Sequence, residues 1–291
     1  MLAKLFVLSQ YVTPQLTVSR LAGKLADMDC SPALKNRVVR WFIKRYGVDM
    51  KEALEPDPEA YPSFNAFFTR ALKPGLRPVD PRPSVLVSPV DGAVSQLGKV
   101  SGDRVFQAKG QSFSLTALLG GNHESAKEFA EGEFATIYLA PKDYHRIHMP
   151  LAGKLREMTY IPGKLFSVNP TTAAQVPDLF ARNERVSCIF DTDAGPMALV
   201  LVGAMIVGSM ETTWSGVIAP VNQNVQTFRY DNPETPVSFQ KGDEMGRFRL
   251  GSTVIIVMPR GGVSWDSDQV AGKILRMGEA FGHLKTADQD D

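Results

Sequence analysis

Short runs of β-branched and aromatic residues, separated by glycine and proline, limit most strongly what this chain can fold into. From residue 85 they recur at close spacing, at 85–88, 93–97, 104–108, 134–140, 153–160, 186–191, 197–208, 212–219, 225–229 and 253–258. Such residues suit the pleated surface of a strand, whereas glycine and proline mark turns. Helical patterns between the runs are confined to 114–129 and 174–181. The spacing therefore predicts a β-sandwich or barrel-like core rather than alternating strand–helix units.

The first 50 residues have a different pattern, which predicts helices. Ser31-Pro32 is typical of a helix start, with Ser31 as the N-cap, and Gly47 of a helix end; 14–27 is a second helical candidate. Residues 1–47 carry eight Lys/Arg against two Asp, a net charge of +6 in a chain whose total is +1. Two interpretations stay open. The helices dock on the protein's own core with a solvated basic face, or they lie on an anionic membrane with Trp41 and Phe42 embedded.

The pattern divides the chain into three segments of an α+β protein. We expect a basic amphipathic helical membrane-associating segment at 1–50, a β-rich catalytic domain at 51–262, and a mobile polar tail at 263–291. Ser63 is predicted to cap a short aromatic helix. The longest apolar stretch, 197–210, is too short to span a bilayer. No nucleic-acid reader motif occurs, so a nucleic-acid partner is not expected.

Two widely separated cysteines, Cys30 and Cys188, show no metal-type spacing. We interpret both as reduced thiols of a cytosolic protein.

A loop after the run 134–140 carries two of the four histidines, His145 and His148. Loops at strand ends often carry function, because a rigid scaffold positions them. The pair has three interpretations: two metal ligands completed by Asp143 or Asp91, two surface histidines, or an acid–base pair.

Two further dipeptides have a plain and a chemical interpretation. Asp91-Gly92 is typical of a tight turn between strands, but an aspartate there can also orient an imidazole. Gly251-Ser252 is typical of a turn into the strand that follows. If the turn is strained and a base lies near, the Ser252 hydroxyl can instead attack the Gly251 carbonyl. Asp91, one histidine and Ser252 would then form an Asp-His-Ser triad.

These motifs together resemble the phosphatidylserine decarboxylases, in particular the bacterial membrane-associated type. The resemblance rests on Val90-Asp91-Gly92, on His145-Arg-Ile-His148-Met-Pro and on Leu250-Gly251-Ser252-Thr253. It extends over about 1–258 through further segments at 63–73, 77–78, 107–110, 156–158, 163–169, 179–185 and 244–248.

The resemblance implies a pyruvoyl-dependent enzyme. The Gly251–Ser252 bond is then cut by the chain itself, giving a β chain of residues 1–251 and an α chain of residues 252–291. Asp91, His148 and Ser252 are implied as the self-cleavage triad, and Ser252 becomes a covalent pyruvoyl cofactor. This group takes phosphatidylserine as a Schiff base, and loss of CO2 leaves phosphatidylethanolamine. His145 is the candidate proton donor, and no metal is required.

The same resemblance suggests where the enzyme works and with what. We expect it to lie peripherally on the cytoplasmic face of the membrane, held to anionic phospholipid by the basic segment. Its expected partner is its lipid substrate. The α and β chains are expected to stay associated with each other, and a homodimer is left open. The main alternative is a Ser-His-Asp hydrolase that uses Ser252 as a conventional nucleophile, although a Gly-x-Ser-x-Gly elbow is absent. A non-enzymatic peripheral membrane protein is a second alternative.

Overall fold

The computed structural model describes residues 2–15, 17, 19, 26, 31–204, 209–218, 224–249 and 252–285. Its helices are α1 (Leu2–Val12), α3 (Pro32–Tyr46), α4 (Phe64–Phe68), α5 (Leu115–Leu118), α6 (His123–Glu128), α7 (Pro170–Ala173) and α8 (Leu179–Arg182). Its strands are β1 (Val85–Val87), β2 (Gly92–Lys99), β3 (Arg104–Ala108), β4 (Gln111–Ser114), β5 (Glu133–Leu139), β6 (Arg146–His148), β7 (Gly153–Ile161), β8 (Arg185–Thr192), β9 (Gly195–Gly203), β10 (Met210–Thr212), β11 (Gly216–Ile218), β12 (Gln226–Arg229), β13 (Ser238–Phe239), β14 (Glu244–Phe248), β15 (Ser252–Met258), β16 (Val263–Trp265), β17 (Ile274–Leu275) and β18 (Ala280–Leu284).

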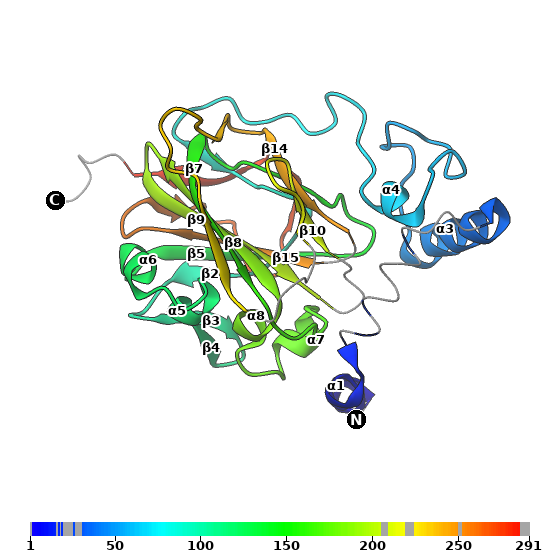
Figure 1. Cartoon of the computed structure of the whole chain (residues 1–291), viewed down its shortest axis with the longest axis horizontal. Coiled ribbons are helices and arrows are strands. Elements are labelled where there is room, and N and C mark those ends of the chain that lie inside the picture. The colour runs from blue at the N-terminus through cyan, green and yellow to red at the C-terminus, as the bar shows by residue number, and fades with distance from the viewer. Residues whose placement is uncertain are drawn as a thin grey trace.

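A large antiparallel sheet forms the centre of the molecule, in the order β12-β7-β8-β9-β15-β5-β2-β17, with β13 also pairing β7 (Figure 1). Strand β15 lies in its interior and pairs with β9 on one side and β5 on the other. Its residues Thr253 to Met258 are all buried. A strand paired on both sides and covered on both faces needs the near-continuous apolar run seen at 253–258.

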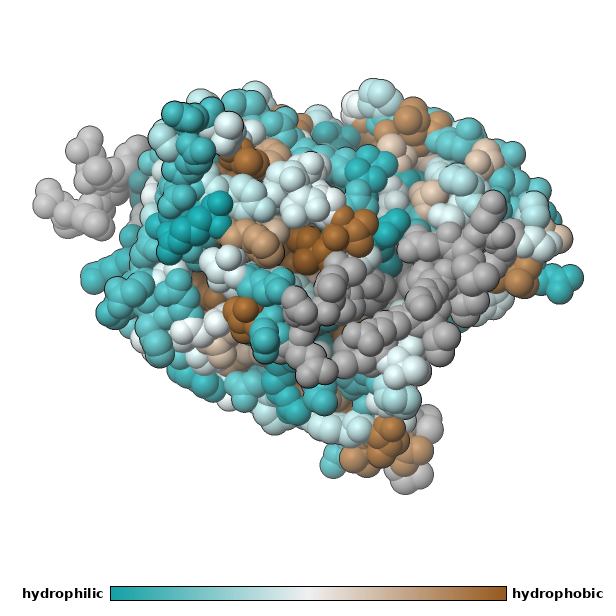
Figure 2. All heavy atoms as spheres, viewed as in Figure 1, coloured by the Kyte–Doolittle hydropathy of each residue, from teal (hydrophilic) through white to brown (hydrophobic). Residues whose placement is uncertain are grey.

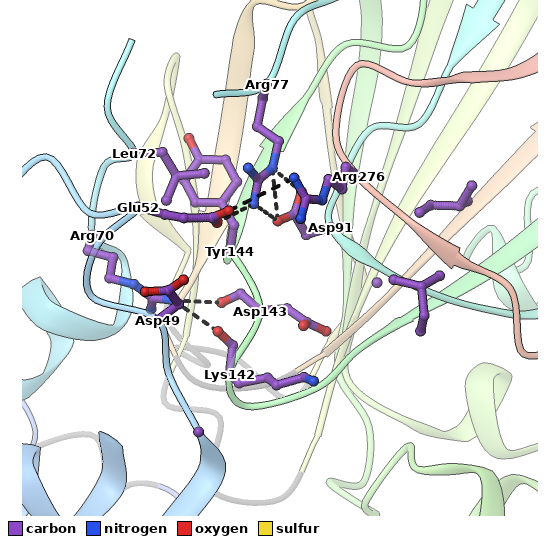
Figure 3. Close-up of a pocket in the computed structure, with 14 residues that line it drawn as sticks. Asp49, Glu52, Arg70, Leu72, Arg77, Asp91, Lys142, Asp143, Tyr144 and Arg276 are labelled. Atoms are coloured by element: carbon purple, nitrogen blue, oxygen red, sulfur yellow. Dashed lines mark hydrogen bonds and ion pairs between the residues drawn. The ribbon is translucent and has the colours of Figure 1, made fainter. Parts of the chain in front are cut away.

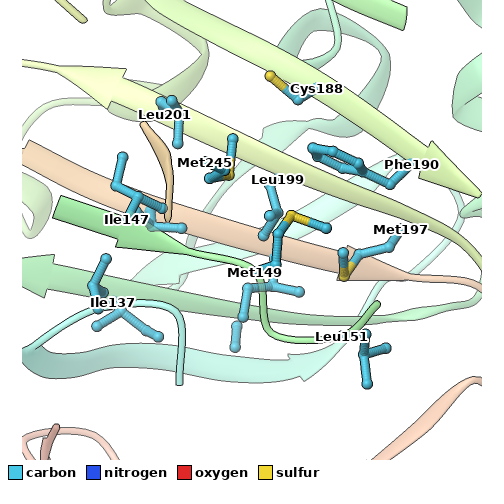
Figure 4. Close-up of a cluster of buried hydrophobic side chains, with 14 of the residues drawn as sticks. Ile137, Ile147, Met149, Leu151, Cys188, Phe190, Met197, Leu199, Leu201 and Met245 are labelled. Carbon is cyan, nitrogen blue, oxygen red and sulfur yellow. The ribbon is translucent and has the colours of Figure 1, made fainter. Parts of the chain in front are cut away.

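Two hydrophobic cores lie on opposite faces of this sheet. On one face, side chains of the large sheet pack against two smaller sheets, β11-β10-β14-β6 and β1-β18-β16 (Figure 4). The other face is covered by α1, α5, α6, α7 and α8, which Figure 1 shows below the sheet. The prediction of an α+β protein with a sheet-rich core is confirmed.

Local differences from the sequence predictions have identifiable causes. The helix predicted at 114–129 is split into α5 and α6 at Gly120-Gly121, whose φ angles of 90° and 89° are not helical. The run 212–219 is not one strand: β10 and β11 form a hairpin through a turn at 213–215. Helix α3 begins at Pro32 and ends at Gly47 as predicted, but Ser31 makes no side-chain capping hydrogen bond. Ser63 does cap α4, since its hydroxyl accepts from the amide of Ala66. Most of the 14–27 candidate lies outside the described residues.

The prediction of a mobile polar tail from 263 is wrong for residues 263–284. This segment forms β16, β17 and β18, and β18 pairs with both β1 and β16. Phe281 is fully buried in the core, together with Val263. The apolar residues here are too few and too scattered to give a strand pattern, and the partners of β17 and β18 include β2 and β1, far earlier in the chain. The tail prediction for 286–291 lies outside the described residues.

Residues 31–72 form a separate small unit beside the sheets. Val39 and Phe42 of α3 pack with Phe67 and Phe68 of α4 in a cluster of their own. Trp41 is instead 58% exposed, so the two aromatic residues that the sequence assigns to one membrane-embedded face have different environments. None of the described helices is long and apolar enough to cross a membrane.

Candidate active site

Three neighbouring strands bring the sequence-predicted residues to one end of the large sheet. Asp91 immediately precedes β2, the histidine loop follows β5, and Ser252 begins β15. The register pairs Ala93 with Tyr138 and Ser252 with Leu139, so these three chain ends are adjacent. The segments are far apart in sequence, and only the pairing of β2, β5 and β15 brings them together.

Ser252 is held through its backbone on both sides. It pairs with Leu139 of β5 and with Gly203 of β9. Gly251 lies outside the described residues, as does the side chain of Ser252. A chain break just before Ser252 would therefore leave residues 252–258 anchored by two neighbouring strands.

Strand β6 positions His148. Ile147 points into the core, so the alternation of the strand directs His148 to the opposite side. The backbone N–H of His148 donates to the carbonyl of Pro89, which joins the histidine loop to the turn that carries Asp91. The loop and the turn are thus in direct contact through their backbones.

The imidazole of His148 has two hydrogen-bond partners. Nδ1 lies 2.7 Å from the carbonyl oxygen of Gly242, which can only accept, so Nδ1 carries the proton. The hydroxyl of Tyr144 lies 3.1 Å from Nε2 and donates to it. Burial lowers the pKa of His148 below its ordinary value, while the Gly242 hydrogen bond and the charge of Glu244 oppose this shift. The imidazole is therefore neutral at pH 7, with its lone pair on Nε2.

Gly242 can direct its carbonyl at His148 because glycine has no side chain. Its φ is +90°, and a Cβ at this position would lie 2.7 Å from a methyl group of Val79.

The dipeptide Asp91-Gly92 differs from the tight turn between strands that is its plain interpretation, because β1 pairs with β18 rather than with β2 and no hairpin forms. A Cβ on Gly92 would lie 2.6 Å from the carbonyl oxygen of Tyr138, so this glycine permits close approach of β2 to β5.

Asp91 is buried and held by three donors. Its carboxylate accepts from Nε and Nη2 of Arg77, the latter at 2.6 Å, and from the amide of Met277 at 2.8 Å (Figure 3). Within the described residues no hydrogen bond joins Asp91 to His148. Its negative charge nevertheless acts on the imidazole, favouring the protonated form and so opposing the lowered pKa of His148. The charge of Asp91 therefore stabilises a protonated His148 without a direct hydrogen bond among the described residues.

His145 has a different environment from His148. It is fully buried and stacks on Phe68 of α4, with ring centroids 4.0 Å apart and planes 24° apart. The carbonyls of Pro141 and Ala140 face it, but among the described residues no well-formed hydrogen bond reaches either ring nitrogen. Burial, reinforced by the charge of Arg70, lowers the pKa of His145 to about 3. His145 is therefore uncharged at pH 7.

The separate environments of the two histidines bear on metal binding. Asp91 is paired with Arg77, His148 with Gly242 and Tyr144, and His145 packs on Phe68. Across the described part of the chain no three His, Cys, Asp or Glu residues converge as metal ligands. Cys188 is a free thiol within the core, where burial raises its pKa; Cys30 is outside the described residues.

Sequence reasoning missed four residues of this site: Arg77, Tyr144, Gly242 and Phe68. None belongs to a chemical motif that is recognisable from spacing. Tyr144 contacts His148 within the same loop, four residues away, whereas Arg77, Gly242 and Phe68 reach predicted site residues because other segments fold against them. Arg77 was noted only as part of a segment that resembles the family.

Comparison with known proteins gives one consistent result. A family model described as phosphatidylserine decarboxylase matches residues 64–283, and a second model, described as PSD, matches residues 5–47. The chain is 71% identical over 284 residues to the phosphatidylserine decarboxylase proenzyme of Marinobacter nauticus, which covers 98% of this chain and 99% of that protein. It is 57% identical over 281 residues to the proenzyme of the same name from Pseudomonas fluorescens, covering 96% of this chain and 97% of that protein. The proenzyme from Bordetella pertussis is 58% identical over 280 residues, covering 96% of this chain and 94% of that protein. The chain therefore belongs to the phosphatidylserine decarboxylase family.

Proposed function

We propose that this chain is a proenzyme that cuts its own Gly251–Ser252 bond and then converts phosphatidylserine to phosphatidylethanolamine and CO2. The observation that carries the proposal is the meeting of the Asp91 turn, the histidine loop and Ser252 at one end of three paired strands. In a chain of this family, that juxtaposition supplies a hydroxyl, a base and a carboxylate at one place.

His148 is the proposed base for self-cleavage. Its pKa lies below the ordinary value, so it is neutral at pH 7 and can accept a proton. The Gly242 carbonyl keeps the proton on Nδ1 and leaves Nε2 as the acceptor. Asp91 stabilises the imidazolium that forms when the proton of the Ser252 hydroxyl is taken.

The cleavage itself needs only groups of this chain and one water. Ser252 Oγ forms a bond to the carbonyl carbon of Gly251 as the peptide C–N bond breaks, and the amine takes a proton, which leaves an ester. Loss of a proton from Cα of Ser252 and departure of the Gly251 carboxylate give a dehydroalanine amine. Water hydrolyses this enamine, releasing ammonia and leaving a pyruvoyl group on residue 252. The product chains are residues 1–251 and residues 252–291.

The environment of residue 252 fits a group that must stay in place after the break. Pairing with β5 and β9 holds the new chain end, as noted above. The pyruvoyl ketone supplies the electron sink for loss of CO2.

His145 is the proposed proton donor to the substrate carbon. With a pKa of about 3 it acts through the N–H of a neutral imidazole. Phe68 of α4 stacks on this ring and so fixes its plane.

We propose that the enzyme reaches its lipid substrate by lying on the cytoplasmic face of the membrane. Apolar side chains of α1 and α3 are exposed to solvent, namely Leu5, Phe6, Leu8, Tyr11 and Val12 of α1 and Leu34, Val38 and Trp41 of α3. Figure 2 shows the apolar residues gathered over α1 at the bottom of the view. Together with the net charge of +6 on residues 1–47, this surface suits an anionic bilayer.

Intact-mass measurement of the purified protein tests the proposed function. Two chains divided after residue 251, with no free amine at the start of the smaller, are expected. His148→Ala should remain one chain, because the base is gone. A wild-type protein that stays whole and hydrolyses esters would instead support the Ser-His-Asp hydrolase. Production of phosphatidylethanolamine from phosphatidylserine vesicles checks the second reaction.

Vesicle flotation tests the membrane surface separately. Trp41→Ser removes an apolar side chain that is 58% exposed, so folding should be little affected, whereas binding to phosphatidylserine-containing vesicles should weaken. Phe228→Ser removes a side chain that is 46% exposed on β12 and serves as the control. Equal flotation of the two variants would exclude α3 from the membrane contact.

A further inference from the structure

The carboxylate of Asp91 is clamped by a single side chain. Arg77 Nε lies 2.9 Å from Oδ1 and 3.1 Å from Oδ2, and Nη2 lies 2.6 Å from Oδ2 (Figure 3). This fork is the strongest geometry available to a carboxylate, since the planar guanidinium matches both oxygens. The side chains of Arg77 and Asp91 are only 7% and 11% exposed, so solvent screens the pair little.

The clamp fixes the plane of the Asp91 carboxylate. Oδ1 accepts from Arg77 Nε and from the amide of Met277. Oδ2 accepts from Arg77 Nη2 and, at 3.1 Å, from Nε. Three of these four contacts come from Arg77, so this side chain sets the orientation of the carboxylate.

Arg77 is held in turn by Glu52, which belongs to the small unit formed by residues 31–72. Its Nη2 lies 2.7 Å from Oε2 of Glu52. Burial alone would lower the pKa of Arg77, but the hydrogen bonds to Asp91 and Glu52 raise it above the ordinary value. Oε1 of Glu52 also lies 3.9 Å from Nη1 of Arg276, so the two carboxylates face two guanidinium groups. The charge of Asp91 nevertheless favours the protonated form of His148.

We propose that Arg77 is a positioning residue for self-processing: it holds the Asp91 carboxylate in the orientation in which its charge stabilises the His148 imidazolium. Arg77 touches neither the hydroxyl nor the scissile bond and acts only through Asp91. This inference rests on the proposed role of Asp91 in cutting the Gly251–Ser252 bond.

The expected size of the effect follows from the geometry that is lost. Without the fork, the carboxylate is held by one amide and can turn away from the imidazole. A misplacement of about 1 Å costs on the order of 100-fold in rate. Arg77→Ala should therefore slow chain cleavage about 100-fold. Arg77→Lys keeps a charge but loses the two-point contact, so it should cleave more slowly than the wild type and faster than Arg77→Ala.

A cavity beside the ion pair allows a test that separates positioning from folding. It has a volume of about 250 Å³, and its lining includes Arg77, Asp91, Tyr144 and Arg276. Removal of the Arg77 side chain would enlarge it and open a path to Asp91 for a small planar cation. Millimolar guanidinium should then restore a substantial part of the cleavage rate of Arg77→Ala, and leave the wild-type rate unchanged.

The experiment follows cleavage of the newly made full-length chain by pulse-labelled cell-free synthesis. Arg82→Ala is the matched control, because Arg82 makes the same fork with Asp80 at an exposed site, and it should cleave at the wild-type rate. Asp91→Asn tests the underlying role of Asp91. If Asp91→Asn cleaves normally, the proposed role of Asp91 fails. If Asp91→Asn is blocked but Arg77→Lys cleaves at the wild-type rate, the inference about Arg77 is overturned alone. A slow Arg77→Ala chain that guanidinium does not accelerate also overturns it, since its defect is then in folding.

Discussion

Replacing His145 by leucine should make this protein less sensitive to acid. His145 is fully buried, stacks on Phe68, and has no well-formed hydrogen bond among the described residues. Leucine is apolar and similar in size, so it removes the ionisable group without opening a large cavity. At neutral pH the substitution should change the free energy of unfolding by less than about 1.5 kcal/mol.

The magnitude of the acid effect follows from the pKa of His145, which is 6.5 in the unfolded chain and about 3 in the folded protein. Because the folded pKa is depressed, the contribution to stability is complete above pH 6.5 and is lost as the pH falls toward 3. Each pH unit across this window costs about 1.4 kcal/mol. Between about pH 8 and pH 5, His145 should therefore reduce the free energy of unfolding by about 2 kcal/mol, and the leucine variant should lack this loss.

The assay is urea unfolding at several pH values, with and without His145→Leu, in a chain that also carries Ser252→Ala. Alanine has no hydroxyl, so both proteins stay uncleaved and unfold as single chains. His148 and the carboxylates titrate in both, so their effects cancel in the difference. If the two proteins lose stability in parallel from pH 8 to pH 5, His145 is not buried in the uncharged form and the reasoning fails.

Three further predictions test the site and the fold. Gly242→Ala should cost about 1–3 kcal/mol, because φ is +90° and the new Cβ would meet Val79, and it should slow cleavage by displacing the carbonyl that orients His148. Gly102→Ala is its control, since φ is +58° there and nothing lies within 4 Å of the added Cβ; equal losses in urea unfolding would rule out the Val79 contact. Tyr144→Phe removes the hydroxyl that occupies Nε2 of His148, so cleavage on a gel should be at least as fast as in the wild type, and a block would make the phenol part of the chemistry. Phe281→Ala should lower the free energy of unfolding in urea by about 3–5 kcal/mol, because the side chain is fully buried. A loss below about 1 kcal/mol would mean that residues 263–284 do not pack in the core.

The sequence predicted strands best where one strand lies buried between two others. The run 253–258 became β15, paired on both sides and covered on both faces, so nearly every residue had to be apolar. Residues 263–284 gave no such signal, because β16, β17 and β18 are only three, two and five residues long, which is too short for a pattern to be recognised. Their stability comes from pairing with β1 and β2, which local sequence does not reveal.

The histidine loop shows the same limit within the site. His145 and His148 are three residues apart, and sequence alone offers either of them as an acid, a base or a ligand. Packing separates them: Phe68, from another part of the chain, buries one, while the Gly242 carbonyl orients the other. The pKa of each histidine depends on this burial, so the difference arises only on folding.

Sequence by itself determined the family, the β-rich core and the candidate residues Asp91, His145, His148, Gly251 and Ser252. The β-rich core follows from local residue types, because strand formation depends on which side chains are present. The family and the candidate residues follow from motifs that resemble those of known phosphatidylserine decarboxylases. The tertiary structure decided that Asp91 is clamped by Arg77 and that the two histidines differ in environment. It also decided that the ends of β2, β5 and β15 meet. Contacts between distant segments, such as that between Asp91 and Met277 at a separation of 186 residues, depend on strand register and core packing, and neither can be read from a local pattern.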